Sequence, residues 1–167
     1  MAEKLTPLGQ KKMNWHMALI YFILWLMAFM NLCNGLVNVF GVQLGQTADG
    51  AVGVALHTYP SMEHARIFIL DGVFTLIMCI YTVFVRFQLA GFKRRAPIYL
   101  TVLFALNIVE SVVYVLVLNA LVPEMVATYK ANGNDLVMTT VVNSAVTAVV
   151  AGLTYVYYLR RKEMFTK

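Results

Sequence analysis

Four stretches of this 167-residue chain are long and apolar enough to cross a lipid bilayer as helices. A helix rises about 1.5 Å per residue, so a hydrocarbon core of about 30 Å takes about 20 mostly apolar residues. The four stretches cover residues 17–40, 66–86, 97–122 and 136–159. Each is apolar around most of its circumference, and none alternates as the strands of a membrane β-barrel do. The sequence therefore predicts an all-α membrane protein, a bundle of four transmembrane helices in a single membrane domain.

Composition excludes the main soluble alternatives. Hydrophobic residues make up 60% of the chain and charged residues 13%, against roughly 45–50% and about 25% in soluble globular proteins. A soluble domain, a disordered chain and a secreted disulfide scaffold are therefore excluded. The net charge of +5 would indicate nucleic acid in a soluble protein, but here the positions of the charges carry the information. Nucleic acid is not an expected partner.

The basic residues predict the orientation in the membrane. Of 13 Lys and Arg, 11 fall before the first span, between the second and third spans, or after the fourth: Lys4, Lys11, Lys12, Arg86, Lys93, Arg94, Arg95, Arg160, Arg161, Lys162 and Lys167. Only Arg66 and Lys130 fall on the other side. Short loops rich in Lys and Arg stay in the cytoplasm. We therefore expect a multi-pass protein of the cell membrane, a bacterial inner membrane, with both termini cytoplasmic. Because no A-x-A-like site follows it, the first stretch is expected to be kept as a span rather than cleaved as a signal peptide.

The connections and the two cysteines carry further expectations. Residues 41–65 form the long outer loop, in which the apolar run 51–56 is expected to lie on the membrane surface as a short helix. Residues 123–135 form a loop with a turn at Asn132-Gly133-Asn134. Cys33 and Cys79 lie at about 24 Å and about 10 Å from the cytoplasmic ends of their helices, whereas a disulfide needs Cα atoms within about 7 Å. We expect both thiols to be free, which disfavours a membrane thiol oxidoreductase.

Two acidic residues lie inside predicted spans, where a charge costs about 2.5–3.5 kcal/mol at the centre on insertion scales. Glu110 lies about 20 Å from the inner end of its span, and Asp71 lies about 7 Å below the outer surface. Polar residues at similar depth recur at helical spacing on the first, third and fourth spans: Asn31, Asn34, Asn38, Asn107, Ser111, Tyr114, Asn143 and Thr147. Lipid cannot satisfy these groups, so we expect them to point inward and bond one another or water.

Three interpretations of this polar cluster stay open. It is a structural network, a functional polar cavity or proton-accepting site, or an interface with a partner subunit; the sequence favours the first. The candidate ligand or proton site comprises Glu110, Asp71, Asn34, Asn38, Asn107, Tyr114 and Asn143. Because burial disfavours a charged carboxylate, we expect Glu110 to be protonated at neutral pH and hydrogen-bonded to Asn34, Asn38 or Asn143.

A stripe of small residues on the fourth span concerns packing. Thr140, Ser144, Ala148 and Gly152 follow one another at four-residue steps, a spacing that lets helix backbones approach closely. Packing inside the bundle is the favoured interpretation, and a dimer face is the alternative.

Other patterns carry little chemistry. His57, Glu63 and His64 do not have the spacing of a metal site, so no metal is expected. The basic groups 93–95 and 160–162 are suited to anionic lipid, although topology already explains them. No Gly-rich phosphate loop, no H-E-x-x-H motif and no nucleophile with a plausible base is present. We expect no enzymatic activity and no cofactor.

Two segments of the chain carry a family resemblance. YTVFVRFQLAGFKRRAPIYLTVLFALNIVE (residues 81–110) has a basic hinge with a proline that opens the third span, and TYVYYLRRKEMF (residues 154–165) ends the last span in Tyr and basic residues. Both resemble parts of a family of small bacterial inner-membrane proteins with four spans and a domain of unknown function. The resemblance implies fold and location only.

The sequence thus favours a non-enzymatic integral membrane protein with a polar intramembrane cluster, either an accessory subunit or a small-ligand binder. The alternative is a small proton-coupled carrier or permease that acts as an oligomer through Glu110 and Asp71. The expected partners are the lipid bilayer and a second copy of the chain or a larger membrane complex.

Reporter fusions test the orientation. Fusions at Lys167 and within residues 93–95 should report the cytoplasm, and fusions near Gly50 or Asn132 should report the outside, because the basic residues hold their loops inside. An external signal at Lys167 would contradict either the number of spans or their orientation.

Overall fold

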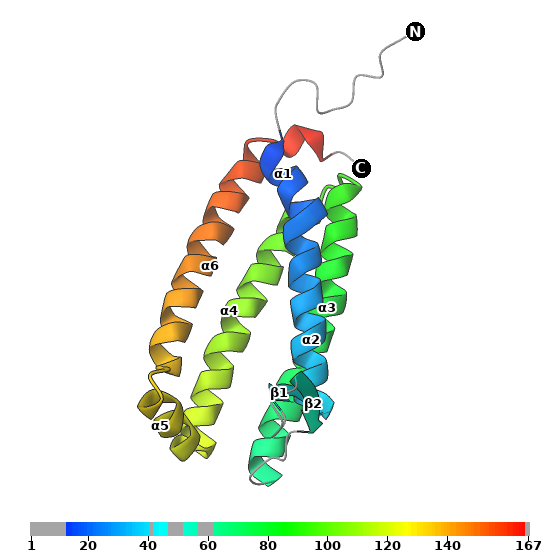
Figure 1. Cartoon of the computed structure of the whole chain (residues 1–167). Helices are drawn as coiled ribbons and strands as arrows, with labels where there is room; N and C mark the ends of the chain where they lie inside the picture. Colours follow the sequence, from blue (N-terminus) through cyan, green and yellow to red (C-terminus); the bar gives the residue numbers. More distant parts are fainter. Residues whose placement is uncertain (1–12, 41, 47–51, 57–61, 166–167) are drawn as a thin grey trace.

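The computed structural model describes residues 13–40, 42–46, 52–56 and 62–165, the two short strands by their backbone only. Four helices are long and apolar enough to cross a membrane: Asn14–Phe40, His64–Ala90, Ala96–Leu121 and Leu136–Leu159. The predicted bundle of four transmembrane helices is confirmed (Figure 1). The first two helices extend beyond the predicted spans, because a helix continues into the headgroup region until a residue such as Gly91 ends it.

The first span contains a widened turn. It comprises α1 (Asn14–Ala18), the π-helical turn η2 (Leu19–Ile23) and α2 (Leu24–Phe40). A π-helical turn leaves a carbonyl without its usual partner in the helix. The Nε atom of Arg86, on α3 (Met62–Ala90), donates to the carbonyl oxygen of Ile20 at 3.2 Å. Arg86 also lies over the ring of Trp25, 5.1 Å from its centroid, so this cation is held by the first span.

The closest helix contact joins α2 to α3. A Cβ atom on Gly72 would lie 2.9 Å from the carbonyl oxygen of Gly35 and 2.8 Å from the Cβ atom of Asn38. A Cβ atom on Gly35 would lie 2.6 Å from the Cγ atom of Leu76. Real Cβ atoms do not approach that closely, so the two glycines are what allows the helices to pack at this distance. The sequence analysis overlooked this pair.

The third span follows a tight turn. Phe92 has a φ of 51°, and the Lys93 amide donates to the carbonyl oxygen of Gln88 at 3.1 Å. Helix α4 (Ala96–Leu121) then begins with Pro97 in its first turn, where a missing N–H costs nothing.

The fourth span, α6 (Leu136–Leu159), begins at a side-chain cap. Asp135 Oδ1 accepts from the Met138 amide at 3.0 Å, and this hydrogen bond lowers the pKa of Asp135. Helix α6 packs mainly against α4.

One end of the bundle, here called the terminal end, brings together Met13, Phe92 and Phe165 in one buried cluster. Both described ends of the chain therefore lie on the same side (Figure 1). His16 is also buried at this end. Its Nδ1 atom lies 2.9 Å from the hydroxyl of Tyr158, and its ring lies 5.0 Å from that of Phe92.

The connections at the opposite end differ from the expectation. The run 51–56, expected as a short helix, instead contains strand β2 (Val52–Leu56), which pairs antiparallel with β1 (Val42–Gln46). Val52 and Val54 are β-branched, and a second apolar segment is near in sequence to pair with, which favours a hairpin. The loop 123–135 holds a further helix, α5 (Pro123–Ala131). The turn that follows is confirmed, with Gly133 at a φ of 81°.

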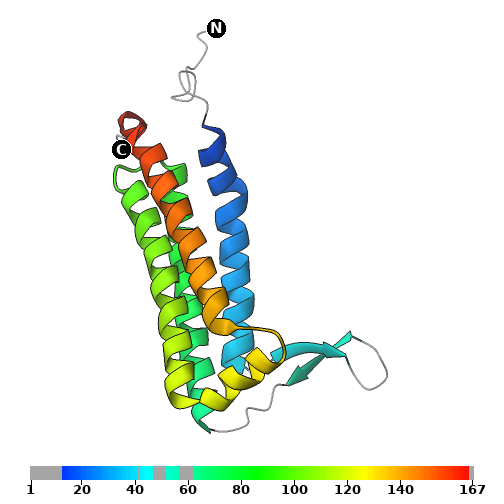
Figure 2. The same cartoon turned by 90° about the vertical axis from the view of Figure 1, so that its left-hand side faces the viewer.

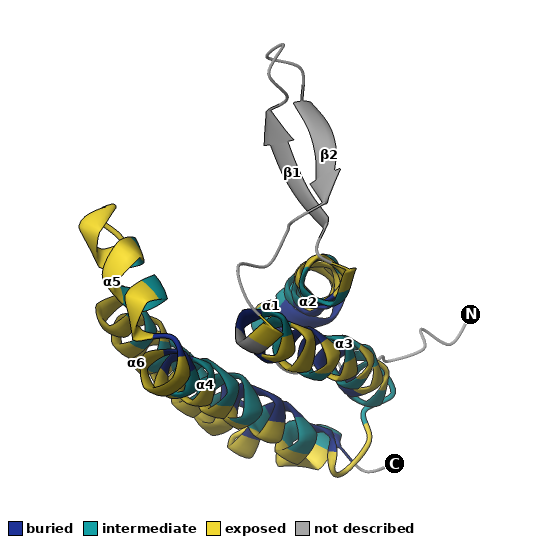
Figure 3. Ribbon diagram, turned by 90° about the horizontal axis from the view of Figure 1, so that it is seen from below, coloured by how far each residue is buried: buried dark blue, intermediate teal, exposed yellow. Residues whose placement is uncertain are grey.

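The outer side of α6 is not covered by the rest of the chain (Figures 2 and 3). Ala148 and Gly152 are exposed, and nothing lies within 4 Å of a Cβ atom built on Gly152. The favoured interpretation of the small-residue stripe, packing inside the bundle, is therefore wrong for these two residues. The close glycine contact lies on α2 and α3 instead. Cys33 and Cys79 are both free, as expected.

Matched Gly→Ala variants test this packing. Gly72→Ala places a methyl group against backbone of α2 and should lower the free energy of unfolding by about 1–3 kcal/mol through overpacking. Gly152→Ala should be neutral, or stabilising by up to about 1 kcal/mol through helix propensity. Thermal unfolding in one detergent measures both variants. Equal stability of the two would contradict the close approach of α2 and α3.

Candidate functional site

A cavity of about 580 Å³ lies between α3 and α4, in the half of the bundle away from the terminal end. Four of its lining residues carry polar or charged groups: Arg66, Asp71, Glu110 and Tyr114. The other seven are apolar: Ile67, Leu70, Phe74, Val109, Val113, Val117 and Leu121. The two intramembrane acids singled out in the sequence therefore face one largely apolar space.

Asp71 is held by the first span. Its Oδ2 atom accepts a hydrogen bond of 2.8 Å from the Nδ2 atom of Asn38 on α2. Asn38 lies beside Gly72, where α2 and α3 are closest. The prediction that Asn38 belongs to the polar cluster is confirmed, and the glycine contact explains how it reaches Asp71.

Glu110 is held by Thr75 rather than by an asparagine. Thr75 Oγ1 lies 3.0 Å from Glu110 Oε1 and 2.8 Å from the carbonyl oxygen of Asp71. A hydroxyl has only one hydrogen to donate. As donor in both contacts, Thr75 shares its one hydrogen between the two acceptors, whereas a proton on Glu110 donated to Thr75 would satisfy both contacts fully. The prediction that Glu110 bonds to Asn34, Asn38 or Asn143 is therefore wrong. The prediction that Glu110 is protonated is compatible with this geometry.

The sequence analysis overlooked Thr75, although a signal was present. Asp71 and Thr75 are four residues apart, so they share one face of α3. Thr75 is buried, and Asp71 and Glu110 are half-buried. The carboxyl groups of Asp71 and Glu110 lie close enough to interact electrostatically. A single hydroxyl therefore links the acid on α3 to the acid on α4.

The other predicted polar residues lie outside this cavity. Asn34 and Asn143 are exposed on α2 and α6. Asn107 donates to the carbonyl oxygen of Leu103 on its own helix at 2.8 Å and, with Thr147, lines a separate cleft of about 200 Å³ among α2, α4 and α6. The prediction that all these polar groups point inward and form one network is therefore wrong, because their side chains lie on different sides of the bundle.

Some buried polar side-chain atoms have no partner within the part of the chain that the structure describes. Asn31 Nδ2 and Ser144 Oγ are the two among them that belong to residues singled out in the sequence analysis. Ser144 belongs to the small-residue stripe and is half-buried, whereas Ala148 and Gly152 are open. Neither atom lines the cavity between α3 and α4.

The cavity combines acceptors with an apolar wall. Tyr114 packs edge-on against Phe68, with ring centroids 6.3 Å apart. Arg66 is exposed at the outer end of α3, and within the described residues it forms no ion pair with Asp71. Asp71 and Glu110 therefore offer carboxyl oxygens to a molecule inside the cavity, beside the other polar lining residues Arg66 and Tyr114. Such a site suits a hydrogen-bond donor or a cation attached to an apolar body.

The loop residues considered for a metal contribute little. His57 and the side chain of Glu63 lie outside the described residues. His64 is buried and already has an interaction partner. Among the described ranges, no three His, Cys, Asp or Glu side chains are grouped to hold a metal ion.

Comparison of the chain with models of protein families, with curated protein sequences and with solved structures finds no match. The resemblance to small four-span inner-membrane proteins stays a prediction.

Variants of Thr75 and Glu110 test the link between the acids. Thr75→Val keeps the side-chain shape but removes the hydroxyl, which leaves Glu110 without its partner. The free energy of unfolding should fall by about 1–3 kcal/mol. Glu110→Gln should be close to neutral, because its amide can donate to Thr75 as a protonated carboxyl does.

A double-mutant cycle provides the control, measured by thermal or chemical unfolding. In a Glu110→Leu background the contact between Thr75 and Glu110 is already absent. Thr75→Val should therefore lower the free energy of unfolding by less than about 1 kcal/mol in that background. An equal cost in both backgrounds would show that Thr75 and Glu110 are not coupled.

Proposed function

We propose that this chain is a non-enzymatic protein of the bacterial inner membrane that binds a small amphiphilic molecule in the cavity between α3 and α4. The ligand has an apolar body and a protonated amine or a similar hydrogen-bond donor. The observation that carries the proposal is the pair of carboxyl groups, Asp71 and Glu110, on an otherwise apolar wall.

The geometry supports a binding role over a purely structural one. If the acids served packing alone, their oxygens would be used up by neighbouring helices. Each instead has one protein side-chain donor or partner, Asn38 for Asp71 and Thr75 for Glu110. A carboxylate has about four acceptor positions. Both acids therefore keep acceptor capacity on the side that lines the cavity.

The charge balance supports a cationic ligand. Inside a bilayer an uncompensated carboxylate is costly, and one bound cation would offset the charge of Asp71 while Glu110 stays protonated. An anionic ligand would face repulsion from Asp71, and Arg66 lines the cavity near the start of α3 rather than between the two acids.

The cavity volume sets the size of the ligand. A space of about 580 Å³ falls within the range of about 300–1,000 Å³ for small-molecule sites. The apolar lining favours an alkyl or aromatic body over a hydrated inorganic ion.

Octylamine and octanol, which share an apolar chain, test the proposal on the purified full chain in nanodiscs. Octylamine should raise the melting temperature in a saturable manner at a pH where it is protonated, and octanol should do so much less. The variant Asp71→Asn/Glu110→Gln should weaken the apparent affinity for octylamine about 10-fold or more, the loss expected of hydrogen bonds to charged groups.

The matched control is Glu124→Gln, which removes an exposed carboxylate on α5. It should keep the affinity of the unmodified chain. Equal effects of octylamine and octanol, or equal losses in Glu124→Gln and the double variant, would overturn the proposal.

A proton-coupled carrier is the second candidate, and the position of Thr75 favours it, because a proton on Glu110 would satisfy both contacts that the Thr75 hydroxyl makes. Reconstituted liposomes with an internal pH dye distinguish the two roles. A carrier would move protons in response to an octylamine gradient and would lose this flux in Glu110→Gln. A binder would show saturable octylamine binding without flux.

A further inference from the structure

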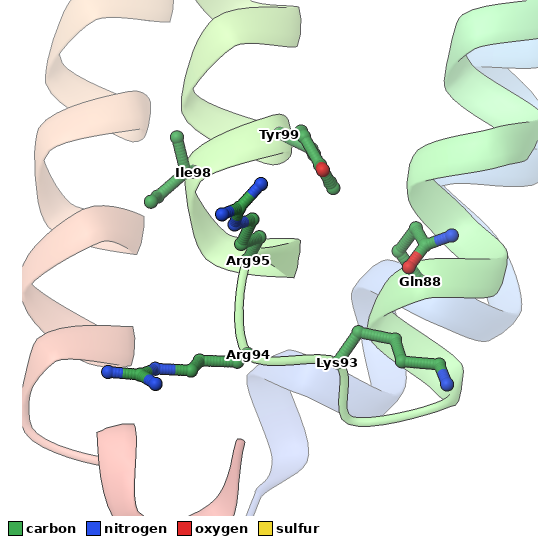
Figure 4. A pocket seen from close by; sticks show the side chains of 6 residues that line it. All are labelled: Gln88, Lys93, Arg94, Arg95, Ile98 and Tyr99. Atoms are coloured by element: carbon green, nitrogen blue, oxygen red, sulfur yellow. The ribbon is translucent and has the colours of Figure 1, made fainter. Parts of the chain in front are cut away.

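A second concave site lies at the other end of the same two helices, and its chemistry is the opposite of the acidic cavity. It has a volume of about 640 Å³ and is lined by Gln88, Lys93, Arg94, Arg95, Ile98 and Tyr99 (Figure 4). This volume falls within the range of about 300–1,000 Å³ for small-molecule sites. The site is therefore large enough for a phosphate group together with an organic substituent.

The three consecutive cations in this site are not neutralised by the protein. Lys93, Arg94 and Arg95 are exposed, and the ion pair found within the described residues joins Lys130 to Asp135 instead. Figure 4 shows Lys93 and Arg94 extending to opposite sides, with Arg95 between them beside the first turn of α4. Three cations without an ion-pair partner among the described residues thus line one concave site, with their side chains pointing in different directions.

The surroundings add further donors. Arg95 is the N-cap residue of the 26-residue helix α4, where Pro97 has no N–H and the amides of Ala96 and Ile98 already donate to backbone carbonyls. This end of α4 therefore contributes the positive end of the helix dipole rather than free amides. The Tyr99 hydroxyl and the Gln88 side-chain amide also make no hydrogen bond within the described residues.

The turn that carries the cations is anchored. Phe92, directly before Lys93, lies 5.0 Å from the His16 ring and 5.6 Å from the Phe165 ring, centroid to centroid. The hydrogen bond from the Lys93 amide to Gln88 closes the turn on α3. The three cations therefore extend from an anchored backbone. A basic loop that served only to orient the protein in the membrane would not need such an anchor.

The wall above the cations continues as an apolar surface toward the membrane centre. Ile98, Val102, Ala105 and Val109 recur at steps of three or four residues on α4, and all four are exposed. Residues at this spacing form one stripe along a helix. An acyl chain attached to the bound group would therefore lie along α4, which favours a lipid over a free anion.

We infer that the site lined by Lys93, Arg94 and Arg95 binds the phosphate of an anionic phospholipid headgroup, with the acyl chains along the exposed stripe of α4. This inference does not depend on the proposed function, because the headgroup site and the acidic cavity share no lining residue, and Val109 at the far end of the stripe is the one residue that the stripe shares with the cavity. It goes beyond the orientation role of the basic residues, since orientation needs neither a concave site nor an anchored turn.

The full chain reconstituted in phosphatidylcholine nanodiscs containing a small fraction of spin-labelled phosphatidylglycerol tests the inference. The protein should enrich phosphatidylglycerol at its boundary over an equally labelled phosphatidylcholine. The variant Arg94→Gln/Arg95→Gln should lower this preference about 30-fold, as expected for two basic residues at an anionic surface.

The variant Arg160→Gln/Lys162→Gln is the matched control, because it removes two exposed cations at the same end but outside the site. Its preference should change less than threefold. Equal losses in the two variants would overturn the inference in favour of general surface charge, as would an unmodified chain without preference for phosphatidylglycerol. Reporter fusions should confirm that both variants keep their orientation.

Inorganic phosphate separates the two sources of the anion. Added in millimolar amounts, it should leave the bound phosphatidylglycerol in place, because it lacks the acyl chain. Complete displacement at such concentrations would show a site for free phosphate and would overturn the assignment to lipid.

Discussion

The close approach of α2 and α3 is the contact on which the acidic cavity depends. It occurs at Gly35 and Gly72, where neither helix has space for a Cβ atom. In a membrane, helices gain little from the hydrophobic effect when they associate, so close backbone packing and polar contacts replace it. Here both occur together, because Asn38 reaches Asp71 beside the glycines. A larger side chain at Gly72 would push the two helices apart and would break the hydrogen bond from Asn38 to Asp71.

The polar groups within the membrane are linked pairwise rather than as one network. Asn38 holds Asp71, and Thr75 joins the backbone of Asp71 to Glu110. Each link crosses one helix interface, first from α2 to α3 and then from α3 to α4. The acids therefore tie three of the four spans together, while α6 is attached elsewhere through α4 and through contacts such as the hydrogen bond of 3.2 Å from Trp15 to Thr154.

The two concave sites give α3 and α4 a chemical polarity along their length. Near the terminal end, three unpaired cations and the start of α4 form a surface suited to anions. In the other half, two acids line an apolar cavity suited to cations. An amphiphilic cation in the cavity and an anionic lipid below it would therefore contact the same two helices without competing for the same groups.

Much of the architecture could be predicted because it depends on local composition. Four apolar stretches of sufficient length decide the number of spans. The basic residues 93–95 and 160–162, which the structure describes, fall at the terminal end, as their positions in the sequence predict. The costly position of Asp71 and Glu110 could likewise be predicted from depth alone. The hairpin of β1 and β2 could not, since strand pairing depends on a partner segment and not on the apolar run by itself.

Only the tertiary structure decided which polar groups meet and which face outward. Periodicity places Asn34 and Asn38 near one another on a helix, but the rotation of α2 against α3 brings Asn38 to Asp71 and leaves Asn34 exposed. The same applies to the glycines on the spans. The sequence does not distinguish Gly72 from Gly152, but in the structure Gly72 packs against α2 and Gly152 has no neighbour within 4 Å of a Cβ atom built on it. By itself the sequence determined how many helices cross the membrane and how deep the acids lie, because both follow from rise per residue. Helix rotation and partner choice depend on contacts between distant segments, so they were decided by the fold.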